Sequence, residues 1–150
     1  MTFLRISISI FLFTFFFSST NNAEIKKPVC TDKQEMSALS EASTLPNWDR
    51  VYKSFKQYSH CDDGAISEGY SDTIGRLLTE DWKHFDRLHE LCSSDKQFQQ
   101  FILKHIDMTV SVDILQKIID NARLHCPSEA KKLCEAIESK ASAVWKPKLK

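Results

Sequence analysis

The chain contains little glycine and proline, with 3 and 4 residues among 150. Both residues disfavour helix interiors, so their scarcity leaves long stretches free to be helical. No stretch alternates apolar and polar residues with a period of two, which is the usual signature of a half-buried strand. Apolar residues recur instead at helical spacing. The sequence therefore predicts an all-α protein, a compact bundle of six or seven short helices that is able to form disulfides.

The chain also lacks an excess of charge of either sign, because 20 basic residues balance 20 acidic ones. A protein that holds a nucleic-acid backbone needs a surplus of Lys and Arg, so we expect no nucleic-acid partner. The sequence has no Gly-rich phosphate loop, no GxSxG motif and no pair of His residues spaced as in HExxH. We accordingly expect no cofactor and no metal ligands.

No apolar run is long enough to span a membrane. The longest, Ile6 to Phe17, has 12 residues, whereas a spanning helix needs about 20. This run follows the charged Arg5 and precedes small polar residues that end at Ala23, which is the layout of a secretory signal peptide. We expect residues 1–23 to be removed, and residues 24–150 to form a single α-helical domain. The mature protein is then periplasmic or secreted, without a stable membrane anchor.

The cysteines are five in number, and none of them forms a CxxC pair, which argues against a zinc site or a thioredoxin-like centre. In an exported chain the default interpretation is disulfides. If Cys126 and Cys134 share one helix, their Cα atoms are about 12 Å apart, whereas a disulfide needs about 4.4–6.8 Å. Unless Cys126 folds back from the preceding loop, we expect Cys61–Cys126 first and Cys30–Cys134 second. Cys92 is then the odd thiol.

Several helix starts can be identified from capping patterns. Thr31 with Gln34 forms a capping box before a first helix at about 31–42, and the segment 94–97 forms a second box before a later helix. Met36 and Leu39 give the first helix a thin apolar face. Helices are also predicted at about 47–59 and 81–91.

The helix predicted at 47–59 carries the most aromatic face of the chain: Trp48, Val51, Tyr52, Phe55 and Tyr58. We interpret this stripe as core in preference to a ligand-binding aromatic box. In the next helix, Gly69 and Gly75 are expected to allow a neighbouring helix to approach closely.

Acidic residues gather where that next helix begins. Asp62, Asp63, Glu68 and Asp72, together with Tyr70, form a candidate binding surface. The spacing does not fit a calcium loop. Paired carboxylates could serve glycoside hydrolysis, but caps and helix-dipole partners are expected at the same positions. Farther along, Asp81 and His84 share a helix face, and we favour a surface pair over a catalytic one.

Two segments resemble a known family. They are the aromatic helix that ends in cysteine, VYKSFKQYSHC at 51–61, and the following Glu68-Gly69-Tyr70. Together with the leader and the short helical domain, they are similar to the small exported immunity proteins that bacteria pair with type VI secretion cell-wall amidases. The resemblance implies a periplasmic, non-enzymatic inhibitor that plugs the active-site groove of a peptidoglycan amidase. Proteins of this family are often dimeric, so the resemblance makes a homodimer one possible state of this chain.

The leading functional hypothesis is therefore an exported, non-enzymatic α-helical protein that binds a protein partner, such as a secreted amidase. Two alternatives stay open. One is a small cell-wall hydrolase that uses the acidic cluster between Asp62 and Asp72. The other is a carrier of a small apolar ligand, with the stripe from Trp48 to Tyr58 lining its cavity.

Overall fold

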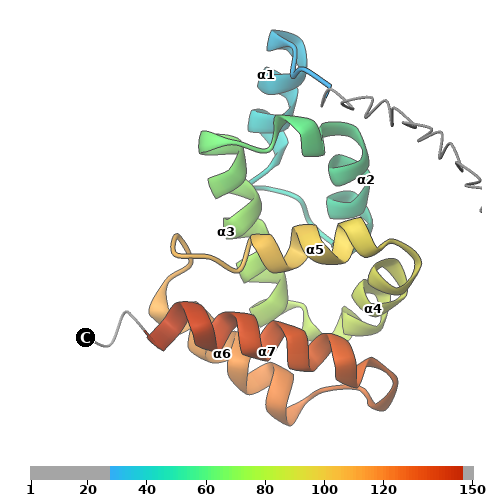
Figure 1. Cartoon of the computed structure of the whole chain (residues 1–150), viewed down its shortest axis with the longest axis vertical. Coiled ribbons are helices and arrows are strands. Elements are labelled where there is room, and N and C mark those ends of the chain that lie inside the picture. Colours follow the sequence, from blue (N-terminus) through green and yellow to red (C-terminus); the bar gives the residue numbers. More distant parts are fainter. Residues whose placement is uncertain (1–27, 147–150) are drawn as a thin grey trace, which may run out of the picture.

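Residues 28–146 are described in the computed structural model of the chain (Figure 1). They form seven α-helices and three one-turn 3-10 helices and contain no strand, so the all-α prediction is confirmed. The α-helices are α1 (Asp32–Glu41), α2 (Trp48–Tyr58), α3 (Gly64–Glu80), α4 (Phe85–Ser94), α5 (Lys96–Lys104), α6 (Val112–Leu124) and α7 (Lys131–Trp145). The 3-10 helices are η1 (Ser59–Cys61), η2 (Trp82–His84) and η3 (Ser128–Ala130). The predicted signal peptide, residues 1–23, lies outside the described residues.

The central element is α3, the longest helix of the described chain. In Figure 1 it runs from α1 and α2 at one end of the molecule to α6 and α7 at the other. Helices α6 and α7 pack side by side, and α5 crosses the middle of the molecule next to α4. One continuous hydrophobic core joins all seven helices.

Side-chain caps fix where several helices begin. The Thr31–Gln34 capping box is present, with the Thr31 N–H donating to Gln34 Oε1 over 3.1 Å. The predicted box at 94–97 is wrong by one residue, because α4 continues through Ser94. Asp95 caps α5 instead, and its Oδ1 accepts hydrogen bonds from the N–H groups of Gln97 and Phe98. A carboxylate can accept two backbone N–H bonds at once, which favours it as the cap.

The aromatic stripe of α2 is core, as predicted. Trp48, Val51, Phe55 and Tyr58 are buried, and Tyr52 is half-buried. The Phe55 ring lies 5.3 Å from the Phe98 ring and 5.0 Å from the Phe101 ring, measured between centroids. These contacts join α2 to α5.

Both glycines inside α3 mark close approaches. A Cβ on Gly69 would lie 3.0 Å from Ala42 Cβ and 3.2 Å from the Ser43 backbone nitrogen. A Cβ on Gly75 would lie 3.3 Å from Ile114 Cγ2. Gly69 therefore lets the end of α1 rest against α3, and Gly75 does the same for α6, which confirms the packing prediction.

The predicted apolar face of α1 is not buried, which corrects the sequence interpretation. Met36 is 73% exposed and Leu39 is 50% exposed. The buried side of α1 carries Ala38, and its C-cap Ala42 lies against Gly69 of α3; these two residues are 0% and 1% exposed. Small side chains allow close backbone contact where Gly69 faces them, so the larger apolar residues are left on the outside.

The four predicted disulfide cysteines do pair, but the predicted partners are wrong. The bridges are Cys30–Cys61 and Cys126–Cys134, and Cys92 is the free, buried thiol as expected. Cys126 lies before η3 and therefore outside α7, which brings its Cα to 6.1 Å from that of Cys134. The Cα separation of about 12 Å expected along one helix does not apply, because only Cys134 lies on the helix. Two disulfides indicate that the protein works in an oxidising, exported environment.

Candidate functional site

The chain enters α3 through a tight turn that carries the first two predicted acidic residues. Gly64 has a φ of 49°, a left-handed conformation that suits glycine. Asp63 is the N-cap, and its Oδ1 accepts a hydrogen bond from the Gly64 N–H over 2.8 Å. The Cys30–Cys61 bridge lies directly before this turn. The start of α3 is thus fixed by a cap, a glycine and a disulfide.

Asp62 points into the protein. Only 5% of its side chain is exposed. Its Oδ2 accepts a hydrogen bond from Lys104 Nζ over 2.6 Å and lies 3.1 Å from His105 Nε2. Burial by itself raises the pKa of the Asp62 carboxyl, but the hydrogen bonds from His105 and Lys104 outweigh it and hold the pKa below its usual value.

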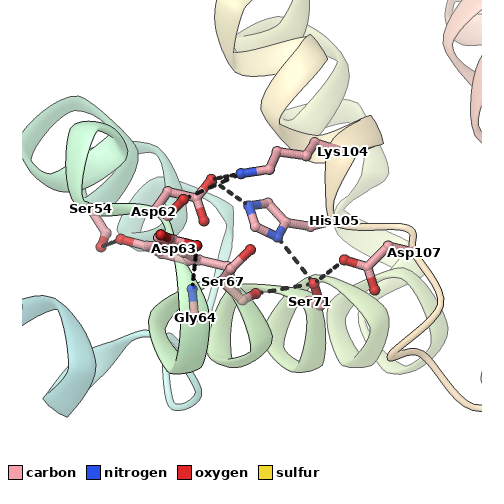
Figure 2. A network of polar contacts seen from close by, with 10 residues as sticks. Ser54, Asp62, Asp63, Gly64, Ser67, Ser71, Lys104, His105 and Asp107 are labelled. Carbon is pink, nitrogen blue, oxygen red and sulfur yellow. Dashed lines mark hydrogen bonds and ion pairs between the residues drawn. The ribbon is translucent and has the colours of Figure 1, made fainter. Parts of the chain in front are cut away.

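A chain of polar contacts continues from Asp62 through the interior (Figure 2). His105 is completely buried, and its Nδ1 lies 3.1 Å from Ser71 Oγ. The Ser71 Oγ lies 2.9 Å from Asp107 Oδ2, and Asp107 in turn accepts two hydrogen bonds from Thr109 through its Oδ1. We call Asp62, His105, Ser71 and Asp107 the buried relay. It ties the start and middle of α3 to the end of α5 and the loop after it.

The buried relay contains a serine, a histidine and an aspartate, but the Ser71 hydroxyl is not placed as a nucleophile would be. Ser71 is 1% exposed, although it borders a cleft. Its single proton has three acceptors within reach, on His105, Asp107 and the Ser67 carbonyl. A nucleophilic hydroxyl must present its oxygen to a substrate while a base holds its proton. The relay joins elements that are far apart in sequence, and within the described residues Asp62 Oδ1 is buried without a hydrogen-bond partner.

The predicted acidic surface is divided by the fold. Glu68 and Asp72 are exposed one turn apart on α3 and line a cleft of about 300 Å³ with Thr109 and Ser111. Asp63 lines a second cleft, described below. Asp62 and Tyr70 do not belong to the surface, which corrects the sequence interpretation.

Tyr70 is completely buried, with its hydroxyl 2.7 Å from Ser54 Oγ and its ring 5.0 Å from the Phe101 ring. Burial raises the pKa of the phenol to about 12. The sequence carries a signal for this position, because Tyr70 follows Ile66 and precedes Ile74 at intervals of four on the core face of α3.

The exposed face of α1 is the surface that sequence reasoning missed. It carries Asp32, Glu35, Met36 and Leu39, which lie within one arc of the helix. Val29, which precedes the helix, is 85% exposed. We call these four helix residues the α1 face. A cleft of about 390 Å³ adjoins it, lined by Glu35, Leu39, His60, Asp63 and the Cys30–Cys61 bridge. Apolar side chains and carboxylates therefore lie together around one disulfide.

Two other predicted groups have plain structural roles. His84 Nδ1 lies 2.6 Å from Asp81 Oδ1, and 60% of the His84 side chain is exposed, so the two form a surface pair. The Cys92 thiol is buried, and burial raises its pKa to about 12, which keeps it protonated and unreactive.

Within residues 28–146, no group of three or more His, Cys, Asp or Glu side chains is placed to hold a metal ion. In the same part of the chain, no helix is both long and apolar enough to cross a membrane.

Comparison with known proteins adds no family to these observations. No protein-family pattern matches the sequence, and neither a curated protein nor a solved structure is significantly similar to it.

Proposed function

We propose that this protein is an exported, non-enzymatic binding protein that acts on a protein partner through the α1 face. The observation that carries the proposal is the exposure of Met36 and Leu39 on a helix whose inner side is packed. Exposed apolar side chains that adjoin one another mark interaction sites more often than isolated ones do. The signal-peptide layout and the two disulfides support export to the periplasm or beyond.

The α1 face is held rigid before any partner arrives. The Cys30–Cys61 bridge fixes the chain just before α1, and the contact of Ala42 with Gly69 fixes its end. A surface that is already ordered loses less conformational entropy on binding, so more of its contact energy remains as affinity. This rigidity suits an inhibitor that inserts a fixed surface into another protein.

The charges on the α1 face favour a cationic partner. Asp32 and Glu35 make no side-chain hydrogen bond or ion pair within the described residues, and Asp63 adds a third carboxylate at the cleft. A partner that sets Lys or Arg beside apolar groups would complement both features. Pairing two copies through this face would bring like charges together, so the homodimer implied by the family resemblance would use another surface.

The family resemblance supplies the partner class. Immunity proteins of the type VI amidase systems bind peptidoglycan amidases, so an amidase with a basic rim around its active-site groove is the proposed partner. A hydrolase function for the acidic cluster is less well supported. A general acid in glycoside hydrolysis needs a raised carboxyl pKa, whereas that of Asp62 is lowered.

Peptidoglycan digestion separates these functions. The purified, oxidised protein is incubated with peptidoglycan alone and with peptidoglycan plus a type VI secretion amidase. We expect no release of muropeptides by the protein alone and slower release by the amidase in its presence. Release by the protein alone, lost in a Glu68→Gln variant, would establish the hydrolase instead. An amidase rate unchanged at saturating protein would reject the amidase as partner.

A further inference from the structure

A third cleft, remote from the α1 face, lies where α4 and α5 meet η3 and the start of α7. It has a volume of about 540 Å³, which is in the range of small-molecule sites. Cys92 and Leu133, 1% and 4% exposed, border it on the apolar side. The rest of its lining is polar, and lysine is its commonest residue.

Three lysines from two helices converge on this cleft: Lys96 of α5, and Lys131 and Lys132 of α7. Lys96 is oriented by two hydrogen bonds of 3.2 Å that its Nζ donates, one to the Cys92 carbonyl and one to Gln99 Oε1. His89 also borders the cleft. Lys131 and Lys132 line it and make no side-chain hydrogen bond or ion pair within residues 28–146. Two of the three ammonium groups are therefore available to a ligand.

The charge of this lining stands out in a chain whose total charge is zero. Three lysines against one carboxylate, Glu129, give the lining a formal charge of +2 with His89 neutral. The formal charges around four other clefts of the described residues sum to zero or to a negative value. The Glu129 carboxylate is held by Ser128, whose hydroxyl donates to its Oε1 over 2.6 Å.

The positions of these lysines are unfavourable for the helices that carry them. The amino end of a helix carries partial positive charge and prefers acidic residues. The first turns of α1, α2, α4 and α6 each contain an aspartate, whereas those of α3, α5 and α7 contain no acidic residue, and α5 and α7 begin with lysine. The cap Asp95 supplies a carboxylate at the start of α5, and Glu129 in η3 supplies one directly before α7. The excess of lysine is therefore clearest at the start of α7, where Lys131 and Lys132 follow a single carboxylate, and local conflicts of this kind are expected at functional sites.

We propose that this cleft binds a small polyanion that bears phosphate groups. An anion would neutralise these ammonium groups and offset the excess of positive charge at the start of α7. Lysine ammonium groups are compact point charges that suit phosphate oxygens, and a diphosphate brings more negative charge than a dicarboxylate to offset the +2 of the lining. The occupant is thus a phosphate ester or a diphosphate in preference to a dicarboxylate.

Titration calorimetry with sodium pyrophosphate at constant ionic strength tests the site. The variant is Lys131→Gln with Lys132→Gln, and the matched control is Lys53→Gln with Lys117→Gln, which removes the same charge from exposed positions on α2 and α6. We expect saturable binding by the wild type and by the control, and at least about a tenfold weaker Kd in the cleft variant. Without ligand, the cleft variant should melt no lower than the wild type, since its lysines oppose the helix dipole.

Two results would overturn the proposal. One is an equal loss of affinity in the cleft variant and the control, which would show that pyrophosphate responds only to total charge. The other is the absence of saturable binding to the folded wild type. Succinate titrated under the same conditions should bind more weakly than pyrophosphate, and equal or tighter binding would contradict the assignment of phosphate.

Discussion

At the residue scale, Phe55 makes two of the aromatic contacts between α2 and α5. It is 7% exposed and lies within ring-contact distance of both Phe98 and Phe101. Phe55→Ala should lower the free energy of unfolding by about 3–5 kcal/mol, because it removes buried area and leaves a cavity. A thermal melt of the oxidised protein measures this, with the exposed Lys53→Ala as control. A melting temperature equal to that of the control would show that the stripe is a binding surface and not core.

The buried relay sets how the fold responds to acid. The pKa values of Asp62 and Asp107 are lower in the folded protein than in the unfolded chain. The stabilisation that these two carboxylates give the fold is therefore complete above the pKa of an unfolded aspartate, about 3.9. It is lost as the pH falls through the pKa values of the two carboxyls in the folded protein. Asp62→Asn should cost about 1.5–3 kcal/mol at pH 7, because it removes a charged hydrogen-bond acceptor from the interior.

The acid response of Asp62→Asn is checked by urea unfolding between pH 7 and pH 3. The difference in unfolding free energy between wild type and variant should be constant near neutral pH and shrink below about pH 4. The exposed Asp72→Asn serves as the control and should follow the wild type throughout. A difference that grows as the pH falls would contradict the assigned direction of the Asp62 pKa.

At the element scale, the close contact between the end of α1 and α3 depends on the absence of a side chain at Gly69. In an open helical position, Gly→Ala stabilises a helix by about 1 kcal/mol. At Gly69 the added Cβ meets Ala42 and the Ser43 backbone, so α1 must shift outward. Gly69→Ala should therefore leave the protein less stable than the wild type. A rise in melting temperature would mean that α1 is not packed on α3 in solution.

The two disulfides should contribute unequally to stability. The Cys30–Cys61 bridge closes a separation of 31 residues and the Cys126–Cys134 bridge one of 8. Loop-closure entropy gives about 4 kcal/mol for the first and about 2.5 kcal/mol for the second. The double variant Cys30→Ser, Cys61→Ser should thus melt lower than Cys126→Ser, Cys134→Ser. The reverse order of melting temperatures would argue that α1 contributes little to the folded state.

At the scale of the whole molecule, the sequence predicts what depends on local interactions. Helix caps such as Thr31 and the core face of α2 follow from residues three or four apart, and the structure confirms both. The disulfide pairing depends on where loops place Cys126, so spacing alone gave the wrong partners.

The elements of the site were harder to predict because they come together only in the folded protein. The buried relay joins Asp62 to His105 across 43 residues. One local signal was available, since His105 continues the buried face of Phe98, Phe101 and Ile102. No local sequence pattern predicts that Met36 and Leu39 are exposed, because the apolar side of an amphipathic helix can lie against the core or against a partner.

We propose that the α1 face serves a partner and does not stabilise the fold. The double variant Met36→Gln, Leu39→Gln, which adds no charge, tests this, with thermal unfolding and amidase inhibition measured on the same preparation. Because both side chains are already exposed, we predict a melting temperature close to that of the wild type together with loss of inhibition. A large drop in melting temperature, or full inhibition by the folded variant, would contradict the claim.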